Sequence, residues 1–288
     1  MKIEFLFPEL VTLYGEKANV EYLKKSLPGA QLVTTSLGEG PAFAIPFTNA
    51  STGNISSSKF SATIPAPDFC YIGSMEEEFF EPALSALRPY KKALERYIDS
   101  GRIFLATGNA IDLFGTKIEW KNRVYPDGHV ADCVLEGLGL FDMTSVIRRD
   151  QSRHNSWFYG EFEDIKIMGH RSTFSRQFMT SQSAQADDSA EAQSIAEEFI
   201  HTLGGFGMND ETKQEGVRRG GFYGTTLLGP LLIMNPPLTK YFIRQMEQTS
   251  GETAPETLFE EKMAMEAYQN RLAYLSKPDA RYIMGALG

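Results

Sequence analysis

Short apolar runs alternate with amphipathic stretches through the first 115 residues of the chain. Buried strands are predicted for Lys2–Phe7, Gln31–Thr35, Asp68–Gly73 and Ile103–Ala106. Helical spacing is present in Val20–Ser26, in Glu76–Tyr97, which Pro82 or Pro89 divides, and at the start of a further helix in Ala110–Phe114. This order of strand and helix is typical of a parallel sheet with helices on both faces, so the pattern predicts an α/β fold.

One segment interrupts this alternation. Residues 38–66 are rich in Gly, Ser, Thr, Ala and Pro and carry almost no charge. Such a composition does not form a useful amphipathic helix, so we predict a surface insertion, as loop or hairpin. A deletion that joins Leu37 to Pro67 is then expected to leave folding intact.

The second half of the chain has a less regular pattern. Hairpins are predicted for Lys117–Val124 with Val130–Leu135 and for Phe206–Asn209 with Gly216–Arg219, and single strands for Thr144–Arg149, Glu161–Met168 and the start of Gly221–Gly229. Ser181–Ala196 is acidic and polar, and part of it is expected to be a mobile loop. Asn235 begins a helix that runs through Ile243. A C-terminal helix is predicted for Glu256–Ser276, with core positions at Leu258, Met263, Met265, Tyr268, Leu272 and Leu275.

Composition and charge exclude several classes of protein. The chain has 288 residues with 42% hydrophobic and 23% charged side chains, as in soluble globular proteins. A net charge of −9 argues against general nucleic-acid binding, which needs a basic face. Two cysteines make no disulfide framework, and four histidines without ligand spacing predict no metal site and no cofactor. No apolar run is long enough for a membrane span and no signal peptide is recognisable, so the cytoplasm is the expected compartment.

The most informative stretch is Phe104–Gly115, which has the pattern of a strand, a tight turn at Thr107–Ala110 and a helix. Enzymes use such an elbow to present a nucleophile, with backbone N–H groups at the helix start as an oxyanion site. The tip here is Gly108 and not Cys or Ser. Either the turn favours glycine because a positive φ costs it nothing, or a nucleophile has been lost.

Four segments, in this order, resemble the class I glutamine amidotransferases of the cobyric acid synthase type. They are Pro8–Asn19 (family pattern Leu-x-x-Tyr-Gly-Asp-x-x-Asn), Tyr71–Glu78 (a Gly-rich turn), Ala106–Gly115 (Ala-x-Cys-Gly-Gly-Tyr-Gln-Leu-Leu-Gly) and Gly224–Leu232 with Asn235-Pro236 (Gly-Thr-Tyr-Leu-His-Gly-Pro-Leu-Leu, then Asn-Pro). The likeness is strongest to GatD, the small subunit that partners a Mur-ligase-like chain in cell-wall amidation. It implies a three-layer, flavodoxin-like α/β/α domain over residues 1–245, with 38–66 as its insertion and 246–288 as a helical extension packed on it.

The departures from the family pattern fall on the chemistry. Gly108 stands at the position of the nucleophilic Cys and Leu228 at that of the general-base His. The resemblance therefore implies that Leu228 lies within side-chain reach of Gly108. It also implies a catalytically degenerate binding or regulatory subunit without glutaminase activity. A Mur-ligase-like synthetase in cell-wall or cobalamin biosynthesis is the partner that it implies. The alternative is an active glutaminase subunit that feeds ammonia to such a synthetase with relocated residues. Cys70 and Cys133 are expected to be core thiols. For Cys133 the alternative is that it serves as a relocated nucleophile.

Ligand contacts are expected from six residues, partly by resemblance: Gly73, Ser74, Asn109, Asp112, His170 and Thr225. Asp112 replaces a glutamine-binding Gln, and His170 matches a family His. Because the Asp112 carboxylate would oppose an anion, we expect an empty cleft or a small neutral or cationic ligand, and weak or no binding of glutamine.

Two charged groups leave alternatives open. Arg148, Arg149 and Arg153 with His154 either grip a phosphate or carboxylate or form an exposed polar loop. The acidic run Glu76–Glu78 either caps a helix or contacts a ligand.

Overall fold

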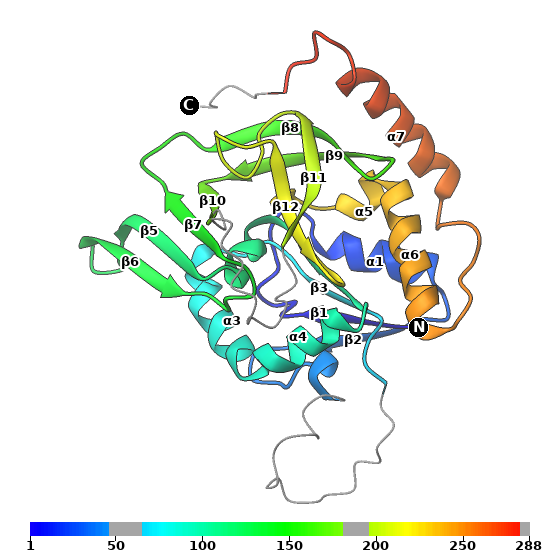
Figure 1. Ribbon diagram of the computed structural model, residues 1–288, viewed down its shortest axis with the longest axis horizontal. Coiled ribbons are helices and arrows are strands. Elements are labelled where there is room, and N and C mark those ends of the chain that lie inside the picture. Colours follow the sequence, from blue (N-terminus) through cyan, green and yellow to red (C-terminus); the bar gives the residue numbers. More distant parts are fainter. Residues whose placement is uncertain (46–64, 181–195, 283–288) are drawn as a thin grey trace, which may run out of the picture.

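A nine-stranded sheet forms the centre of the computed structural model, which describes residues 1–45, 65–180 and 196–282 (Figure 1). Five neighbouring strands are parallel: β2 (Gln31–Thr35), β1 (Lys2–Leu6), β3 (Phe69–Ile72), β4 (Ile103–Ala106) and β13 (Phe222–Gly224). Antiparallel strands continue the sheet: β12 (Gln214–Arg219), β11 (Glu197–Gly204), β8 (His154–Phe162) and β9 (Ile165–Thr173). The α/β fold class expected from the sequence is confirmed.

Helices cover both faces of the parallel strands. One face carries α1 (Lys17–Ser26), α5 (Leu231–Met234) and α6 (Pro236–Ser250), and the other α3 (Phe80–Leu87), α4 (Lys91–Asp99) and the 3-10 helix η4 (Gly108–Phe114). Aromatic side chains fill both interfaces. Phe104 packs on Phe114 and Phe222 at ring-centroid distances of 5.3 and 5.7 Å on one side of the sheet, and Phe69 packs on Phe242 of α6 at 5.9 Å on the other. These layers place the carboxyl ends of the parallel strands at one edge of the sheet.

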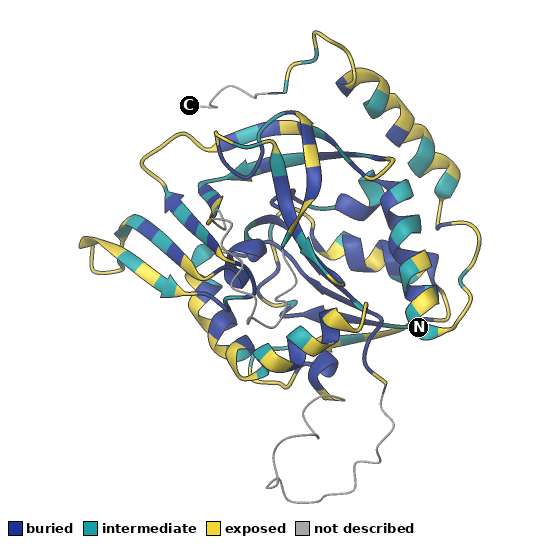
Figure 2. Ribbon diagram, in the orientation of Figure 1, coloured by how far each residue is buried: buried dark blue, intermediate teal, exposed yellow. Residues whose placement is uncertain are grey.

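A second sheet of four strands projects from this body. Its order is β10 (Ser175–Met179), β7 (Met143–Arg148), β5 (Lys117–Val124) and β6 (Val130–Glu136). The predicted hairpin of β5 and β6 is confirmed and forms the tip at the left of Figure 1. Figure 2 shows that this tip is mostly exposed, while the central strands are buried.

Other elements of the second half differ from the prediction. The expected strand Glu161–Met168 crosses the turn between β8 and β9, where Glu163 has φ +53°. The expected hairpin at Phe206–Asn209 is wrong, because β12 pairs with β11, a half-exposed strand that begins with two glutamates. The helix expected from Ala110 is a 3-10 turn that ends at Phe114.

The segment 38–66 contributes to the core at one end. The 3-10 helix η1 (Ala42–Ala44) is buried, and Phe43 packs on Tyr97 and Phe104 at 5.7 and 6.0 Å. The backbone N–H groups of Ala42 and Phe43 donate to the buried Glu4 carboxylate. The expectation of a surface insertion is therefore wrong for residues 42–44. Residues 46–64 of the segment lie outside the described residues, as do residues 181–195 of the acidic stretch Ser181–Ala196.

Near the C-terminus, α7 (Glu261–Leu275) packs on β9 and α6. Tyr268 and Leu275 are buried as predicted, and Leu258 is buried just before the helix. Met263 is 67% exposed, so its predicted core position is wrong. The helix buries the side that carries Tyr268, whose hydroxyl donates to the Lys166 carbonyl at 2.9 Å. Within the described residues, no helix has the length and apolar character that a membrane crossing requires.

Candidate functional site

The elbow after β4 is a sharp turn with no room for a side chain at its tip. Thr107 is extended, and Gly108 follows with φ +60°. A Cβ atom on Gly108 would lie 1.8 Å from Ser74 Oγ and 3.2 Å from Leu228 Cδ2. The predicted proximity of Gly108 and Leu228 is confirmed. The positive φ agrees with a glycine favoured by the turn, and the contacts show that the space beside it is already filled.

A buried carboxylate lies beneath this turn. Glu16, in the loop before α1, is 1% exposed. Its oxygens accept hydrogen bonds from five donors: Ser74 Oγ (2.8 Å), Thr107 Oγ1 (2.8 Å), Asn19 Nδ2 (3.1 Å), the Gly229 N–H (3.1 Å) and the Tyr71 hydroxyl. Burial raises the pKa of the Glu16 carboxyl, and the hydrogen bonds from Tyr71, Ser74 and Thr107 oppose that shift. The donors come from four segments of the chain, so the network fixes the elbow to its neighbours.

Two glycines leave the space that this network occupies. A Cβ on Gly73 would lie 2.6 Å from the Tyr71 hydroxyl, and one on Gly229 would lie 2.7 Å from Glu16 Oε2. Gly73 therefore packs behind the cleft against the network. Glu16 belongs to Pro8–Asn19, one of the four segments that carry the family resemblance. Its role could not be predicted from that segment, because most of its hydrogen-bond partners are distant in the sequence.

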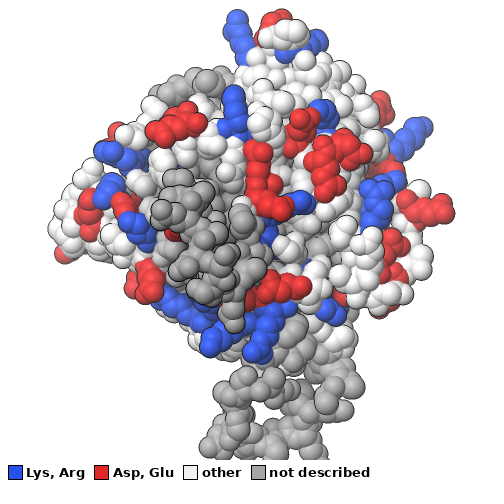
Figure 3. Space-filling model, in the orientation of Figure 1, with Lys and Arg blue, Asp and Glu red and all other residues white. Residues whose placement is uncertain are grey.

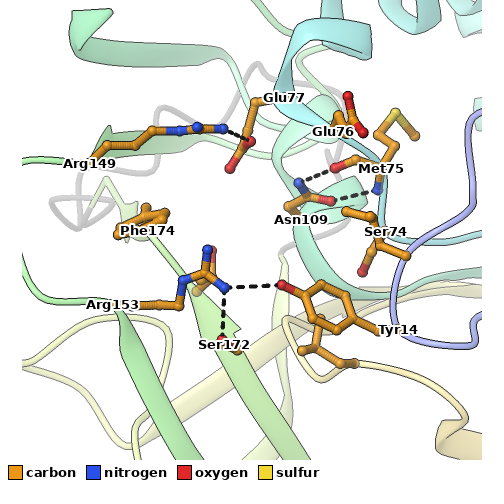
Figure 4. A pocket seen from close by; sticks show the side chains of 13 residues that line it. Tyr14, Ser74, Met75, Glu76, Glu77, Asn109, Arg149, Arg153, Ser172 and Phe174 are labelled. Carbon is orange, nitrogen blue, oxygen red and sulfur yellow. Dashed lines mark hydrogen bonds and ion pairs between the residues drawn. The ribbon is translucent and has the colours of Figure 1, made fainter. Parts of the chain in front are cut away.

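A small pocket opens in front of the elbow (Figure 4). Its volume is about 230 Å³. The lining residues are Leu13, Tyr14, Ser74, Met75, Glu76, Glu77, Asn109, Arg149, Arg153, Ser172, Thr173, Phe174 and Leu228. They come from the carboxyl edge of the sheet and from the loops beside β7, β8, β9 and β10.

Charged side chains of both signs face the pocket (Figure 4). Arg149 Nη2 lies 2.5 Å from Glu77 Oε2. Arg153 Nη1 donates to the Tyr14 hydroxyl and to Ser172 Oγ, both at 3.2 Å, and its guanidinium lies 4.4 Å from the Phe174 ring centroid. No carboxylate within residues 1–45, 65–180 and 196–282 pairs with Arg153. Of the charged groups whose role was left open, Arg149, Arg153, Glu76 and Glu77 line the cleft, whereas Arg148 and Glu78 do not. Contact of these side chains with a ligand stays a prediction.

Of the six residues expected to contact a ligand, Ser74 and Asn109 line the pocket. Asn109 is held by Met75, whose N–H donates to Oδ1 at 3.0 Å and whose carbonyl accepts from Nδ2 at 2.7 Å. Its side chain therefore fixes the turn after β3 to the start of η4. A role of either residue in ligand binding stays a prediction.

Asp112, His170 and Thr225 lie away from the pocket. Asp112 is fully buried and accepts from Ser145 Oγ at 2.7 Å and Gln177 Nε2 at 2.8 Å, and burial raises its pKa to about 6. The expectation that its carboxylate opposes an anion in the cleft is wrong, because η4 turns this side chain toward the second sheet.

His170 contacts Asn155 Oδ1 at 3.0 Å and the edge of the Trp157 ring, and burial lowers its pKa. Thr225 Oγ1 donates to the buried Glu215 at 3.2 Å.

His154, considered together with the arginines, is also buried away from the pocket. Its ring stacks on Phe206 at 4.1 Å and its Nε2 lies 2.8 Å from Asp210 Oδ1. Burial lowers its pKa to about 4.

Neither cysteine lies at the pocket. Cys70 donates to Glu4 Oε2 at 3.2 Å inside the core, where burial raises the pKa of its thiol well above the usual value. Cys133, on the β6 strand, accepts from Arg123 at 3.6 Å. Within the described residues, no group of three or more His, Cys, Asp and Glu side chains could hold a metal ion.

Comparisons with known proteins give structural likeness only. No protein-family model matches the chain, and no curated protein matches it. Among solved structures, one described as a glutamine amidotransferase has 10% identity, covers 84% of this chain and 98% of its own, and has a TM-score of 0.47. A glutamine amidotransferase from Thermotoga maritima has 8% identity, 96% and 93% coverage and a TM-score of 0.40. A ThuA-like protein from Parabacteroides merdae has 10% identity, 90% and 94% coverage and a TM-score of 0.37.

Proposed function

We propose that this chain is a catalytically degenerate, glutamine amidotransferase-like protein whose cleft binds a small molecule and hydrolyses no amide. One observation carries the proposal. The Ser74 hydroxyl occupies the space that a side chain at residue 108 would need, and it donates a hydrogen bond to the Glu16 carboxylate at 2.8 Å. Acyl transfer needs a nucleophile and a base beside it. Gly108 offers no nucleophile, and the Leu228 side chain cannot accept a proton.

Relocated chemistry is the rival proposal. The two cysteines lie in the core and on the hairpin. Among the serine and threonine hydroxyls of the described residues that line the pocket (Ser74, Ser172 and Thr173), Ser74 is the one that donates to a carboxylate, so it is the candidate nucleophile, with Glu16 as its base. Glu16, however, accepts four further hydrogen bonds, from Tyr71, Thr107, Asn19 and Gly229. Burial raises the pKa of Glu16, but five donors share its two oxygens, so no lone pair is left free to take a proton from Ser74. The network therefore supports a structural role for Glu16.

The ligand that fits the cleft best is a small acid. A volume of about 230 Å³ lies below the usual range for drug-sized ligands. Arg153 presents a guanidinium whose protein partners are neutral hydroxyls, and a guanidinium binds a carboxylate through two parallel hydrogen bonds. Because Asp112 is not in the cleft, the reason to expect only neutral or cationic ligands no longer holds.

The activity test is release of glutamate from glutamine by the purified chain, alone and with a Mur-ligase-like synthetase, which stays the expected partner class. We expect no release above a blank without protein. Turnover that is abolished in a Ser74→Ala variant would overturn the proposal in favour of the relocated nucleophile.

The binding test uses thermal shift with a panel of small carboxylic acids, including glutamine. At least one acid should stabilise the protein, and Arg153→Gln should remove the shift. Arg148→Gln is the control, because Arg148 pairs with Asp150 and does not line the pocket. An unchanged shift in Arg153→Gln, or no shift with any acid, contradicts the cleft as an anion site.

A further inference from the structure

Arginine and aromatic side chains alternate in one continuous series that begins at the cleft and ends on the β5–β6 hairpin. We name it the arginine–aromatic ladder, and its members in spatial order are Arg153, Phe174, Arg149, Trp120, Arg123 and Tyr125. From guanidinium carbon to ring centroid, the successive distances are 4.4 Å, 5.9 Å, 5.7 Å, 4.6 Å and 4.9 Å. All fall within the range of cation–π contacts.

A bulge in β5 makes the outer half of the ladder possible. Side chains three apart on a regular strand point to opposite faces, so Trp120 and Arg123 would be separated. The pairing of β5 with β6 shifts register between these two residues, and Asn122 between them has φ +50°. The extra residue turns Arg123 to the face of Trp120, where Tyr125 also lies. The local structure thus brings these three side chains together.

The ladder is continuous with the cleft. Arg153, Phe174 and Arg149 line the pocket, and Phe174 lies between the two guanidinium groups in Figure 4. From Trp120, β5 runs to Val124 and Tyr125 follows directly, which adds on the order of 15 Å at the usual rise of a strand. The ladder is therefore much longer than the small pocket at its inner end. Trp120 itself is only 3% exposed, so the guanidinium groups beside it, and not its ring, are available to a partner.

Two of the three ladder arginines differ from their surroundings in charge pairing, while the third, Arg149, pairs with Glu77. Neighbouring cations have carboxylate partners: Arg148 with Asp150 at 3.3 Å and Lys121 with Asp132 at 3.1 Å. Arg123 and Arg153, at or near the two ends of the ladder, pair with no carboxylate of the described residues. Figure 3 shows acidic and basic side chains interspersed over the hairpin side of the molecule. Stacking holds the guanidinium planes in place, so their N–H edges need little further ordering to bind an anion.

We propose that the arginine–aromatic ladder binds a short acidic segment of a partner protein, extended along β5 from the mouth of the cleft to the hairpin. Carboxylates of that segment pair with Arg123 and, at the cleft, with Arg153. The length of the ladder suits an extended peptide better than a small molecule. Binding at Arg123 lies outside the pocket, so the proposal does not depend on the ligand of the cleft.

Nucleic acid fits this surface less well. Bases bind by stacking on open aromatic faces, and in the ladder the Trp120 and Phe174 rings each lie against two guanidinium groups. Tight binding of a phosphate polymer also draws on many cations, whereas the ladder has three and the chain has a net charge of −9.

The test is fluorescence anisotropy with a labelled peptide of about six glutamates at low salt. A peptide of glutamines and a short single-stranded DNA are the comparison probes. The full chain should bind the glutamate peptide, and Arg123→Gln should weaken that binding about tenfold, the effect of one charge-assisted hydrogen-bonded pair. Arg148→Gln, one strand away and paired with Asp150, should change it less than twofold.

Three outcomes would overturn the proposal: no binding of the glutamate peptide, equal losses in the two variants, or tighter binding of the DNA. Thermal unfolding of each variant shows whether it is folded. Thermal shift with small acids separates this proposal from the cleft proposal, because Arg123→Gln should leave that shift unchanged while Arg153→Gln removes it.

Discussion

At the scale of single residues, the space around Gly108 decides what the elbow can do. Two separate constraints act there. The positive φ disfavours any residue with a Cβ, and a Cβ on Gly108 would lie only 1.8 Å from Ser74 Oγ. Reintroducing a nucleophile at this position would meet both. The packing of the elbow, and not only the identity of residue 108, therefore opposes a nucleophilic side chain at this position.

The first residue-scale prediction separates these constraints. Gly108→Ala should lower the free energy of unfolding by about 1–2 kcal/mol for the left-handed backbone and by a further 1–3 kcal/mol, roughly, for overpacking. Gly128→Ala is the matched control, because Gly128 has φ +85° and nothing within 4 Å of its Cβ position. Urea unfolding gives both values. Equal losses would show that the space beside Gly108 is open.

The second residue-scale prediction concerns the buried Asp112. Burial raises its pKa from 3.8 to about 6 in the folded state. The folded chain then binds the proton more tightly than the unfolded chain, so this group's contribution to stability falls as pH rises from about 4 to 6. Two pKa units correspond to about 3 kcal/mol.

Asp112→Asn removes that titration, and the amide oxygen can still accept from Ser145 and Gln177. The stability of the variant relative to the parent should therefore increase between pH 4 and pH 7, measured by urea unfolding. The comparison is needed because His154 has a lowered pKa and contributes a slope of opposite sign. A difference between the two proteins that does not change with pH would contradict the assignment.

At the scale of elements, the C-terminal helix α7 buries few of its side chains against the body. Its buried side chains are Tyr268 and Leu275, which form a small cluster with Met168, separate from the main core. Tyr268→Ala should increase amide hydrogen exchange throughout α7 while exchange in β1, β3 and β4 is unchanged. Tyr274→Ala, 52% exposed on the same helix, is the control. Faster exchange in the central strands would show that α7 is part of the main core.

The same scale explains which elements the sequence could predict. In the first half, β1, β3 and β4 are each followed by a helical segment, and local apolar spacing predicts β1, α1, β2, β3 and β4 close to their observed bounds. The strand β11 begins Glu197-Glu198 and alternates buried with exposed positions, so its membership in the central sheet depends on pairing with β8 and β12. That pairing is not a property of the segment itself.

At the scale of the whole molecule, the cleft is assembled from distant parts of the chain. The proximity of Gly108 and Leu228 could be expected from the sequence, because the segments Ala106–Gly115 and Gly224–Leu232 resemble the two family segments that carry the paired Cys and His. The sequence could not predict that Glu16 fills the space beneath them, or that Arg149 and Arg153 reach the pocket while Asp112 and His170 do not. Those outcomes depend on how the second sheet packs against the first.

The last prediction concerns chain continuity across the segment 38–66. Phe43 is fully buried, and the N–H groups of Ala42 and Phe43 satisfy the buried Glu4 together with Thr35 Oγ1 and the Cys70 thiol. Joining Leu37 to Pro67 would remove an aromatic ring from the core and leave the Glu4 carboxylate with fewer donors. Contrary to what composition suggests, that deletion should yield little folded protein.

A point variant keeps this prediction testable if the deleted chain is insoluble. Phe43→Ala should lower the free energy of unfolding by about 3–5 kcal/mol, the usual cost of removing a buried Phe side chain. Phe259→Ala, at a ring that is 42% exposed, should cost far less. A soluble deletion variant as stable as the parent, or equal losses in the two alanine variants, would mean that residues 42–44 are dispensable and that the core closes without them.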